Sequence, residues 1–319
     1  MGGQNGFWFE SPVVKKKTKR AVRHWAVYAG VVVIVSVLQA IPRRWGIALS
    51  RTLIRIYYAS SRFHRKNTIH HLTLALGREK SGTEIRRLSR EVFLHFATVG
   101  VDALRIPVYV RQGIDGLITT RNVHFLDQAR DDGKGYILLT GHFGNWELMG
   151  AWVAQKKYHP HVVGAAFSNA KVNQLIVDTR NQAGYVNIER GSATRGIVKA
   201  LRNGYPVALL IDQDTRVKGV FVDFFGMKAH TPIGPAYLAG AFDVPIIPLV
   251  MRLKEDLTYE IECFEPIRHV HTGDRERDMI ATTQKCSDIY ERIIRRHPEQ
   301  WVWMHRRWRK QPESAPIAG

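Results

Sequence analysis

Residues 136–148 read YILLTGHFGNWEL, a short apolar run followed by a turn and the start of a helix. The apolar run from Tyr136 to Thr140 predicts a β-strand. Gly141 and Gly144 permit a tight turn after the strand, because glycine adopts backbone conformations that other residues avoid. A helix is expected to begin at about Asn145. A strand, a turn and a helix in this order are the first unit of a predicted α/β fold.

The same segment contains a candidate catalytic pair, His142 and Glu147. On a regular helix, residues five apart point about 140° away from each other, so the two side chains can meet only if His142 lies off the helix. A turn at His142 meets this condition. Glu147 is then expected to accept a hydrogen bond from one ring nitrogen and leave the other as a base, for which a hydroxyl is the natural substrate. A packed or capping histidine is the structural alternative.

The rest of the chain fits this fold, because helices and short apolar strands alternate from Asn122 onward, as is typical of an α/β sandwich. Strands are expected at 136–140, 161–166, 186–188, 207–211, 220–223, 246–250 and 259–263. Helices are expected at 145–155, 171–183, 194–202, 233–242 and 275–296. Before this region the pattern is helical, with a break and a new helix start at Ser81, Gly82 and Thr83, followed by Glu84.

The expected organisation has four parts. Residues 1–44 form a basic N-terminus and a membrane anchor, and residues 45–121 form a helical segment that packs on the core. Residues 122–310 form the α/β domain, and residues 311–319, rich in Pro, Glu, Ser and Ala, form a flexible tail.

Composition indicates a globular protein with a basic surface. Of the 319 residues, 45% are hydrophobic and 24% charged, and the net charge is +19. Such a surface attracts polyanions, which could be nucleic acid, anionic lipid or an acidic carrier protein. No zinc-finger spacing, RNP-like aromatic pattern or helix-turn-helix supports nucleic acid, so none is expected as a partner. Two cysteines, Cys263 and Cys286, form no disulfide framework and suggest a reducing, cytoplasm-facing domain.

The N-terminal segment predicts a membrane anchor or transmembrane helix. Six Lys and Arg residues between Lys15 and Arg23 precede a valine-rich apolar stretch from Trp25 to Ile41, which Arg43 and Arg44 close. This length is at the lower limit for a spanning helix. A cleaved signal peptide is the alternative, but no small-x-small cleavage site follows.

Polar residues that suit binding follow two later strands. The segment 184–190, GYVNIER, ends in Arg190, which can hold phosphate or carboxylate in a bidentate manner. The strand at 207–211 is followed by Asp212, Gln213 and Asp214, at a strand end where α/β folds build sites. We expect Asp212 and Asp214 to position sugar hydroxyls or arginines. No further ligand cluster accompanies them, so no metal is expected.

Four blocks in this order resemble the motif blocks of the glycerolipid acyltransferases, whose first block is His, four residues, then Asp or Glu. The fourth block is the proline-flanked strand at 244–249. The closer resemblance, from about Ala26 to Arg309, is to the late lauroyl and myristoyl acyltransferases of lipid A biosynthesis. It is carried by residues 142–147, 212–214, 224–226, Thr231, Gly234 and the segment 298–308, PEQWVWMHRRW.

One block departs from the wider pattern. Residues 212–214 read Asp-Gln-Asp where glycerol-phosphate enzymes have Pro-Glu-Gly, which favours the lipid A branch. Mycobacterial mannoside acyltransferases share parts of the pattern and remain an alternative.

The resemblance implies a reaction. A fatty acyl chain passes from acyl-acyl carrier protein to a hydroxyl of a lipid A precursor, with His142 as general base oriented by Glu147. No Gly-x-Ser-x-Gly nucleophile motif is present, so direct transfer without a covalent acyl-enzyme or a cofactor is expected. Backbone N–H groups near Gly144 and Asn145, or Arg180, are expected to stabilise the oxyanion. The related enzymes place an arginine near Arg180, and Arg190 is expected to bind a glycolipid phosphate.

The resemblance also implies a location, the inner membrane with the catalytic domain at its cytoplasmic face and anionic lipid as a partner. By the positive-inside rule, the basic N-terminus would stay in the cytoplasm and a single span would place the domain outside. A helix in the interface, or a tilted half-span, avoids this conflict, and both stay open. The alternative functions are acyl transfer to a lysophospholipid or mannosylated lipid, and membrane binding by a catalytically silent homologue.

Overall fold

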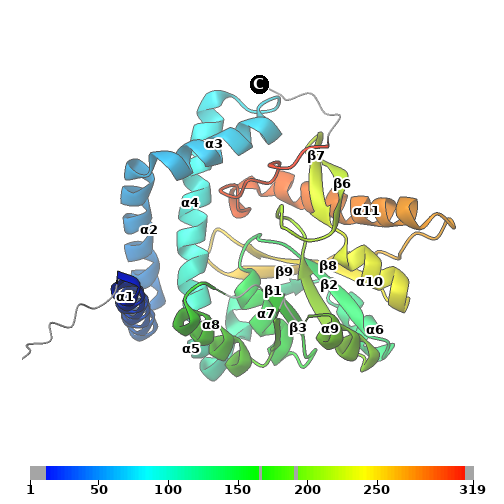
Figure 1. Ribbon diagram of the computed structural model, residues 1–319, viewed down its shortest axis with the longest axis horizontal. Helices are drawn as coiled ribbons and strands as arrows, with labels where there is room; N and C mark the ends of the chain where they lie inside the picture. The colour runs from blue at the N-terminus through cyan, green and yellow to red at the C-terminus, as the bar shows by residue number, and fades with distance from the viewer. Residues whose placement is uncertain (1–11, 165–166, 190–192, 313–319) are drawn as a thin grey trace, which may run out of the picture.

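The described chain is helical from Pro12 to Gln112, apart from short connections. The computed structural model describes residues 12–164, 167–189 and 193–312. Its first helices are α1 (Pro12–Ala40), α2 (Arg43–Ser60), α3 (Arg62–Leu76), α4 (Gly82–Leu104) and α5 (Ile106–Gln112). Helices α2 and α4 run side by side along one side of the molecule (Figure 1). The predicted start of α4 is confirmed by a capping box, in which Ser81 and Glu84 bond each other's backbone N–H.

A mostly parallel sheet forms the centre of the rest. Its strand order is β1-β9-β8-β2-β5-β3-β4, and only β8 and β9 pair antiparallel. The strands are β1 (Ile118–Arg121), β2 (Tyr136–Thr140), β3 (His161–Gly164), β4 (Val186–Glu189), β5 (Pro206–Leu210), β8 (Ile246–Leu253) and β9 (Tyr259–Cys263). A separate hairpin of β6 (Gly219–Phe224) and β7 (Met227–Pro232) packs on α11 (Arg275–Arg296). The α/β prediction is confirmed.

Helices cover both faces of this sheet (Figure 1). They are α6 (His124–Asp131), α7 (Trp146–Gln155), α8 (Ala170–Ala183), α9 (Ala193–Arg202), α10 (Gly234–Phe242) and α11, with short 3-10 turns η1 (Asp115–Leu117) and η3 (Pro298–Gln300). Strand β2 is buried along its whole length, and its alternate side chains enter two apolar cores. Ile137 and Leu139 pack in the core with α11, while Tyr136 and Leu138 pack in the core with α7.

The five helices expected after residue 144 all occur, with bounds within one residue of the prediction. The expected strands also occur, although the last two residues of the predicted strand at 161–166 lie outside the described residues. Strands β1 and β7 were not predicted. Both are rich in polar residues, since β1 reads ITTR and β7 reads MKAHTP, so neither shows an apolar run.

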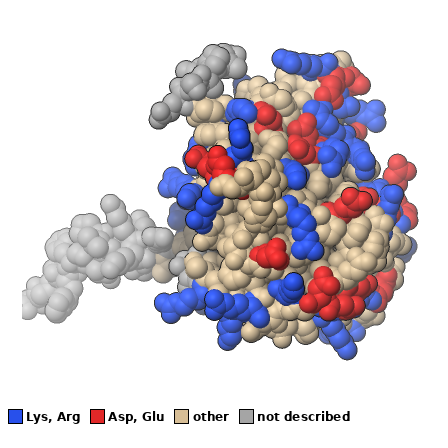
Figure 2. All heavy atoms as spheres, turned by 90° about the vertical axis from the view of Figure 1, so that its right-hand side faces the viewer, with Lys and Arg blue, Asp and Glu red and all other residues tan. Residues whose placement is uncertain are grey.

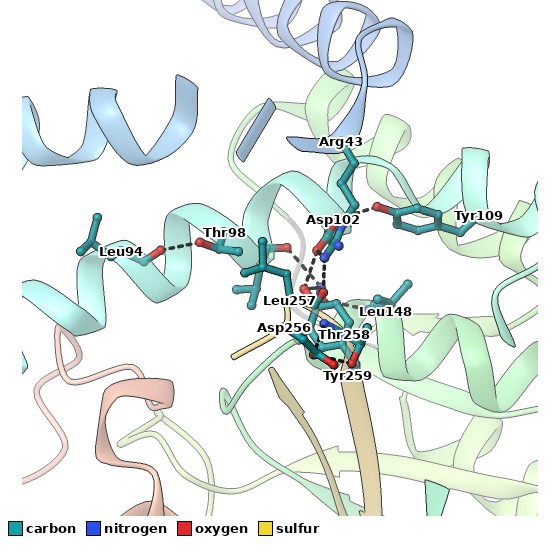
Figure 3. A network of polar contacts seen from close by, with 12 residues as sticks. Arg43, Leu94, Thr98, Asp102, Tyr109, Leu148, Asp256, Leu257, Thr258 and Tyr259 are labelled. Atoms are coloured by element: carbon teal, nitrogen blue, oxygen red, sulfur yellow. Dashed lines mark hydrogen bonds and ion pairs between the residues drawn. The ribbon is translucent and has the colours of Figure 1, made fainter. Parts of the chain in front are cut away.

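A buried carboxylate joins the N-terminal helices to the sheet (Figure 3). Asp102 of α4 accepts hydrogen bonds from Arg43 Nε at 2.8 Å and Nη2 at 2.6 Å. The hydroxyls of Tyr109 and Tyr259 each donate to it at 2.6 Å. Arg43 also donates to the backbone oxygen of Leu257. Four donors compensate the desolvation of this carboxylate, so α2, α4, α5 and β9 are held in one arrangement.

Candidate active site

The pairing of β2 with β5 places His142 beside Asp212. The strands are parallel, and Thr140 is the register partner of Leu210. His142 and Asp212 each follow two residues later, so both emerge from the carboxyl ends of neighbouring strands. This edge of a parallel sheet is where α/β proteins build their sites.

The imidazole and the carboxylate form a close pair. His142 Nδ1 lies 2.9 Å from Asp212 Oδ1, and the backbone N–H of His142 donates to Oδ2 at 2.7 Å. The indole N–H of Trp301 donates to the same Oδ2 at 2.8 Å, and Asp212 is only 3% exposed. An ionised carboxylate can only accept hydrogen bonds, so Nδ1 carries the proton. Nε2 of the neutral ring is therefore available as a base.

The pair perturbs the pKa of both partners. Burial alone lowers the pKa of His142, but the charge of Asp212 and the hydrogen bond to it outweigh burial and raise this pKa above its usual range. Burial alone raises the pKa of Asp212. The charge of His142 and the hydrogen bonds from His142 and Trp301 outweigh it and lower that pKa. The carboxylate thus stays ionised, and the ring is a stronger base than a free imidazole.

Two glycines make this approach possible. A Cβ atom on Gly141 would lie 2.9 Å from Asp212 Cγ and 2.8 Å from Tyr290 Cε1, too close for any side chain. Gly144 has φ +57°, and a Cβ atom there would lie 1.6 Å from the backbone oxygen of Met251. The turn that carries His142 therefore requires glycine at both positions.

The predicted contact between Glu147 and His142 is wrong. Glu147 instead accepts hydrogen bonds from Arg180, Nε to Oε2 at 3.1 Å and Nη2 to Oε1 at 2.5 Å, and from the Tyr185 hydroxyl at 3.0 Å. The reason is the direction of α7, whose first turn points Glu147 toward α8. The pairing of β2 with β5 places Asp212, and not Glu147, beside Nδ1 of His142.

Arg180 stays charged in this arrangement. Burial alone lowers its pKa, but the hydrogen bonds and charge of Glu147 outweigh burial and raise it. Its Nη1 also donates to the side-chain oxygen of Asn187 at 3.1 Å. Glu147 and Asn187 thus fix the orientation of the guanidinium.

His142, Glu147 and Arg180 lie along one cavity of about 860 Å³. The other walls are mainly apolar and come from β2, β3, β5, α7, α9 and the start of α10; they include Leu138, Val153, Val162, Ile197, Leu209 and Ile233. Trp146 also lines the cavity, with its ring centroid 5.0 Å from that of His142. A cavity of this size with mainly apolar walls suits an apolar ligand.

Asn145, predicted to bind substrate, supports the fold instead. Its side-chain oxygen accepts from the N–H of Leu148 at 3.1 Å, which caps α7. Its amide donates to the backbone oxygen of Val99 and the hydroxyl of Tyr259, and the residue is 2% exposed. Because Tyr259 also donates to Asp102, Asn145 connects α7 to the Asp102 network.

The backbone amides predicted to hold an oxyanion are already occupied. The N–H of Gly144 donates to Gln300 at 2.9 Å, and the N–H of Asn145 donates to Met251 at 3.2 Å. The turn packs against β8 and the C-terminal segment, and these two contacts use both donors. Of the donors proposed from the sequence, Arg180 is the one that lines the cavity.

The other predicted acid, Asp214, does not line the cavity. Its buried carboxylate accepts from Arg309 Nε and from the Lys310 N–H, both at 3.3 Å, and lies 3.4 Å from His230 Nδ1. It holds the C-terminal segment in place. Arg190 lies outside the described residues. Among the residues that the structure does describe, no group of three His, Cys, Asp or Glu side chains could hold a metal ion.

Trp301 is a site residue that the sequence reasoning did not assign. The sequence names it only within the segment 298–308, without a role, yet Trp301 is 1% exposed and its indole N–H donates a hydrogen bond to Asp212. A tryptophan 89 residues away in the chain has no local pattern that points to this carboxylate. Only tertiary structure brings them together.

An imidazole that a buried carboxylate holds as a base, on the wall of a mainly apolar cavity, is the kind of site found in enzymes. Residues 13–310 match the family model described as bacterial lipid A biosynthesis acyltransferase, so the chain belongs to this family.

Individual relatives differ in their named acceptors. The chain is 25% identical over 312 residues to the lipid A biosynthesis lauroyltransferase of Escherichia coli K12, covering 92% of this chain and 94% of that protein. It is 28% identical over 187 residues to the phosphatidylinositol mannoside acyltransferase of Mycobacterium tuberculosis H37Rv, and that match covers 57% of each chain. The lipid A biosynthesis palmitoleoyltransferase of Escherichia coli K12 is 28% identical over 194 residues, 59% of this chain and 60% of that protein.

Proposed function

We propose that this protein transfers a fatty acyl chain from acyl-acyl carrier protein to a hydroxyl of a lipid A precursor. The observation that carries the proposal is that His142, paired with Asp212, lines a mainly apolar cavity. Membership in the lipid A acyltransferase family supports the reaction type and the kind of acceptor. The thioester donor is the one that the sequence resemblance implies.

In this mechanism His142 Nε2 removes the proton from the acceptor hydroxyl as its oxygen attacks the thioester carbonyl. The tetrahedral intermediate then collapses, the C–S bond breaks, and the imidazolium returns the proton to the leaving thiolate. Asp212 stabilises the imidazolium through the Nδ1 hydrogen bond, as an orienting carboxylate does in a triad. No enzyme nucleophile takes part, so the acyl chain passes directly to the acceptor.

Arg180 is proposed to stabilise the oxyanion. Glu147 then acts through Arg180, as a positioning residue, and not through His142. We retain Arg190 as a proposed ligand for an acceptor phosphate. Asp214 has a structural role in this scheme, because its carboxylate bonds the C-terminal segment.

The proposed location is the cytoplasmic face of an inner membrane rich in anionic lipid. One helix among the described residues, Ala21–Ala40, is long and apolar enough to cross a bilayer. The net charge of +19 suits both anionic lipid and an acidic carrier protein.

The test is an assay of acyl transfer from acyl-acyl carrier protein to a lipid A precursor. His142→Ala is expected to lower the rate by about 100-fold or more, the usual contribution of a general base. The control is His70→Ala at an exposed position of α3, with folding of both variants checked by thermal melting. Near-wild-type transfer by a folded His142→Ala protein would reject the mechanism.

A mannosylated lipid is the second candidate acceptor, because a mycobacterial mannoside acyltransferase is among the relatives. The same assay with a phosphatidylinositol mannoside separates the two. Faster transfer to the mannoside than to the lipid A precursor would replace the proposed acceptor and leave the base unchanged.

A further inference from the structure

Helix α1 packs against the domain along its apolar length. From residue 24 onward, partly or fully buried positions recur every three or four residues, which places them on one face of the helix. They are His24, Tyr28, Val31, Val32, Val35, Leu38 and Gln39, and Ala29 is partly buried as well. Helices α8, α4 and α2 contact α1. The packed face therefore extends from the start of the apolar stretch to its end.

Polar contacts fasten both ends of this stretch to the domain. At the first end, the Asn169 amide donates to the backbone oxygen of His24 at 2.8 Å. The Lys171 ammonium lies 5.4 Å from the ring centroid of Tyr28. At the other end, Gln39 donates to the Leu104 backbone oxygen at 2.9 Å.

Arg105 adds to this second attachment. It is 8% exposed and donates from Nη1 to the backbone oxygens of Leu38 and Ile41, the latter at 2.8 Å. The domain thus presents charged or amide side chains at both ends of the apolar stretch.

These attachments are incompatible with a helix that crosses the bilayer. Tyr28 and Ile41 are thirteen residues apart, about 20 Å along a helix. If Ile41 lay at the membrane surface of a perpendicular span, Lys171 would lie about 20 Å deep in a hydrocarbon layer about 30 Å thick. If Tyr28 lay at the surface, Arg105 would be immersed instead. Charged groups at such depth are strongly disfavoured.

The outer face of α1 is apolar and uncovered. Val22, Trp25, Val33, Ile34 and Val37 are all exposed, and Trp25 is 61% exposed. Helix α2 follows on the same side of the molecule and exposes Trp45, Leu49, Leu53 and Ile56, which recur at helical spacing (Figure 1). Two neighbouring helices therefore present a large apolar surface, of the kind that marks an interaction site.

The charge of the segment that forms α1 to α3 indicates the kind of partner that this apolar surface fits. Between Pro12 and Leu76, which covers α1 to α3, the chain has thirteen Lys and Arg residues and no Asp or Glu. On the opposite side of the molecule, by contrast, acidic and basic side chains are interspersed (Figure 2). Apolar faces flanked only by cations are complementary to an anionic lipid surface.

We propose that α1 lies in the plane of an anionic bilayer together with α2 and does not cross it. Both ends of α1 then stay on the side of the catalytic domain. This inference rests on the proposed membrane-associated function and specifies its geometry. The basic residues before Trp25 need no translocation, so the conflict with the positive-inside rule disappears. Segment 167–169 lines the cavity at Phe167 and binds α1 at Asn169, so the cavity lies beside the membrane-bound helix.

The first test is topology. The full chain is expressed in a bacterial host with one protease site before Met1 and another after Gly319. We expect both sites to be cut in inside-out inner-membrane vesicles and both to be protected in sealed spheroplasts. Cleavage of the two sites from opposite sides would overturn the proposal.

The second test is depth. A fluorophore is attached to single cysteines at Val22→Cys, Val33→Cys and Val37→Cys, on the outer face of α1, in vesicles of phosphatidylglycerol and phosphatidylethanolamine. The matched control is Ile280→Cys on α11, since Cys263 and Cys286 are both buried. Lipids brominated near the headgroup are expected to quench all three α1 probes to the same extent, at least twofold more than lipids brominated near the bilayer centre, and the control is expected to be unquenched.

A span predicts the opposite pattern, with Val33 quenched most by the deep bromines. Shielding of all three probes by a second copy of the chain would also overturn the proposal. The acyl-transfer assay on the same vesicles keeps the two claims separate. Active protein with a crossing helix would reject the geometry alone, whereas inactive protein with an in-plane helix would count against the proposed function alone.

Discussion

Asp212 is the residue on which the proposed chemistry depends most directly. Three hydrogen bonds reach its carboxylate, two from His142 and one from Trp301, and each stabilises the ionised form. The ionised form in turn holds a proton on His142 Nδ1. A single buried carboxylate thus sets the tautomer, the orientation and the basicity of the ring.

Replacing Asp212 should move the pH dependence of the reaction. The base works only as neutral imidazole, so activity falls as the pH drops through the pKa of His142. Asp212→Asn removes the charge that raises this pKa and leaves the burial that lowers it. We expect the acidic limb of kcat/KM to move to lower pH, with kcat reduced about 100-fold or more. An unmoved limb in the pH profile of the folded variant would contradict the pairing.

Trp301→Phe should move the same limb the other way. Loss of the indole N–H makes the Asp212 carboxylate more basic, which raises the proton affinity of the pair, so the limb is expected at higher pH. Trp303→Phe is the matched control, because the Trp303 indole N–H bonds the backbone oxygen of Pro298 and not Asp212. Equal shifts in the two pH profiles would show that aromatic packing, and not the hydrogen bond, is responsible.

The start of helix α7 contacts two separate parts of the molecule, the Asp102 network and helix α8. Its cap, Asn145, connects it to the Asp102 network, and its first turn holds Arg180 of α8 through Glu147. The ion pair between Glu147 and Arg180 therefore joins the cavity walls that these two helices form. This pair is only partly exposed, so solvent screens it less than a surface pair.

Glu147→Gln should lower kcat without reproducing the pH shift of Asp212→Asn. The charge of Glu147 raises the pKa of His142 less than Asp212 does, so the acidic limb is expected to move to lower pH by a smaller amount. A double-mutant cycle with Arg180→Gln measures the coupling. Because the two residues act as a unit, we expect the double variant to be about as slow as either single variant. Multiplicative losses would indicate independent roles.

The molecule as a whole is electrically asymmetric. Helices α1 to α3 contribute thirteen positive charges with no negative ones, although the net charge of the chain is +19. More than half of the excess charge thus belongs to the sequence of α1 and α2, the helices that we propose contact lipid. Long-range attraction of this kind weakens as salt increases.

Binding to vesicles should therefore depend on these cations. Each basic residue near an anionic surface contributes about 1 kcal/mol, so replacing Arg44, Arg55 and Arg62 together by Gln is expected to weaken binding by about 3 kcal/mol, or roughly 100-fold. The measurement is sedimentation with phosphatidylglycerol-containing vesicles at low salt. The control is vesicles of zwitterionic phosphatidylcholine, which have no net charge. The variant and the original protein should bind to them with equal affinity. An equal loss on both lipids would contradict an electrostatic contribution.

Local sequence patterns determined the elements of this protein. The alternation of apolar runs, turns and amphipathic segments predicted the α/β class and the bounds of α7 to α11, because these depend on residues close together in the chain. The same patterns identified His142, whose turn needs Gly141 and Gly144. Polar strands such as β1 and β7 have no such pattern and were missed.

Tertiary structure decided how distant residues meet. Strand order makes β5 a neighbour of β2, which places His142 beside Asp212, 70 residues away in the chain. The packing of α7 against α8 places Glu147 beside Arg180. Tertiary packing also pairs the backbone N–H groups of Gly144 and Asn145 with backbone oxygens. It places the Trp301 indole beside Asp212. A continuous apolar stretch between basic residues predicted a membrane helix at α1, but only its contacts with α8 and Arg105 give it a direction relative to the domain. Periodicity records which face of an element is apolar, whereas the partner of that face depends on the whole fold.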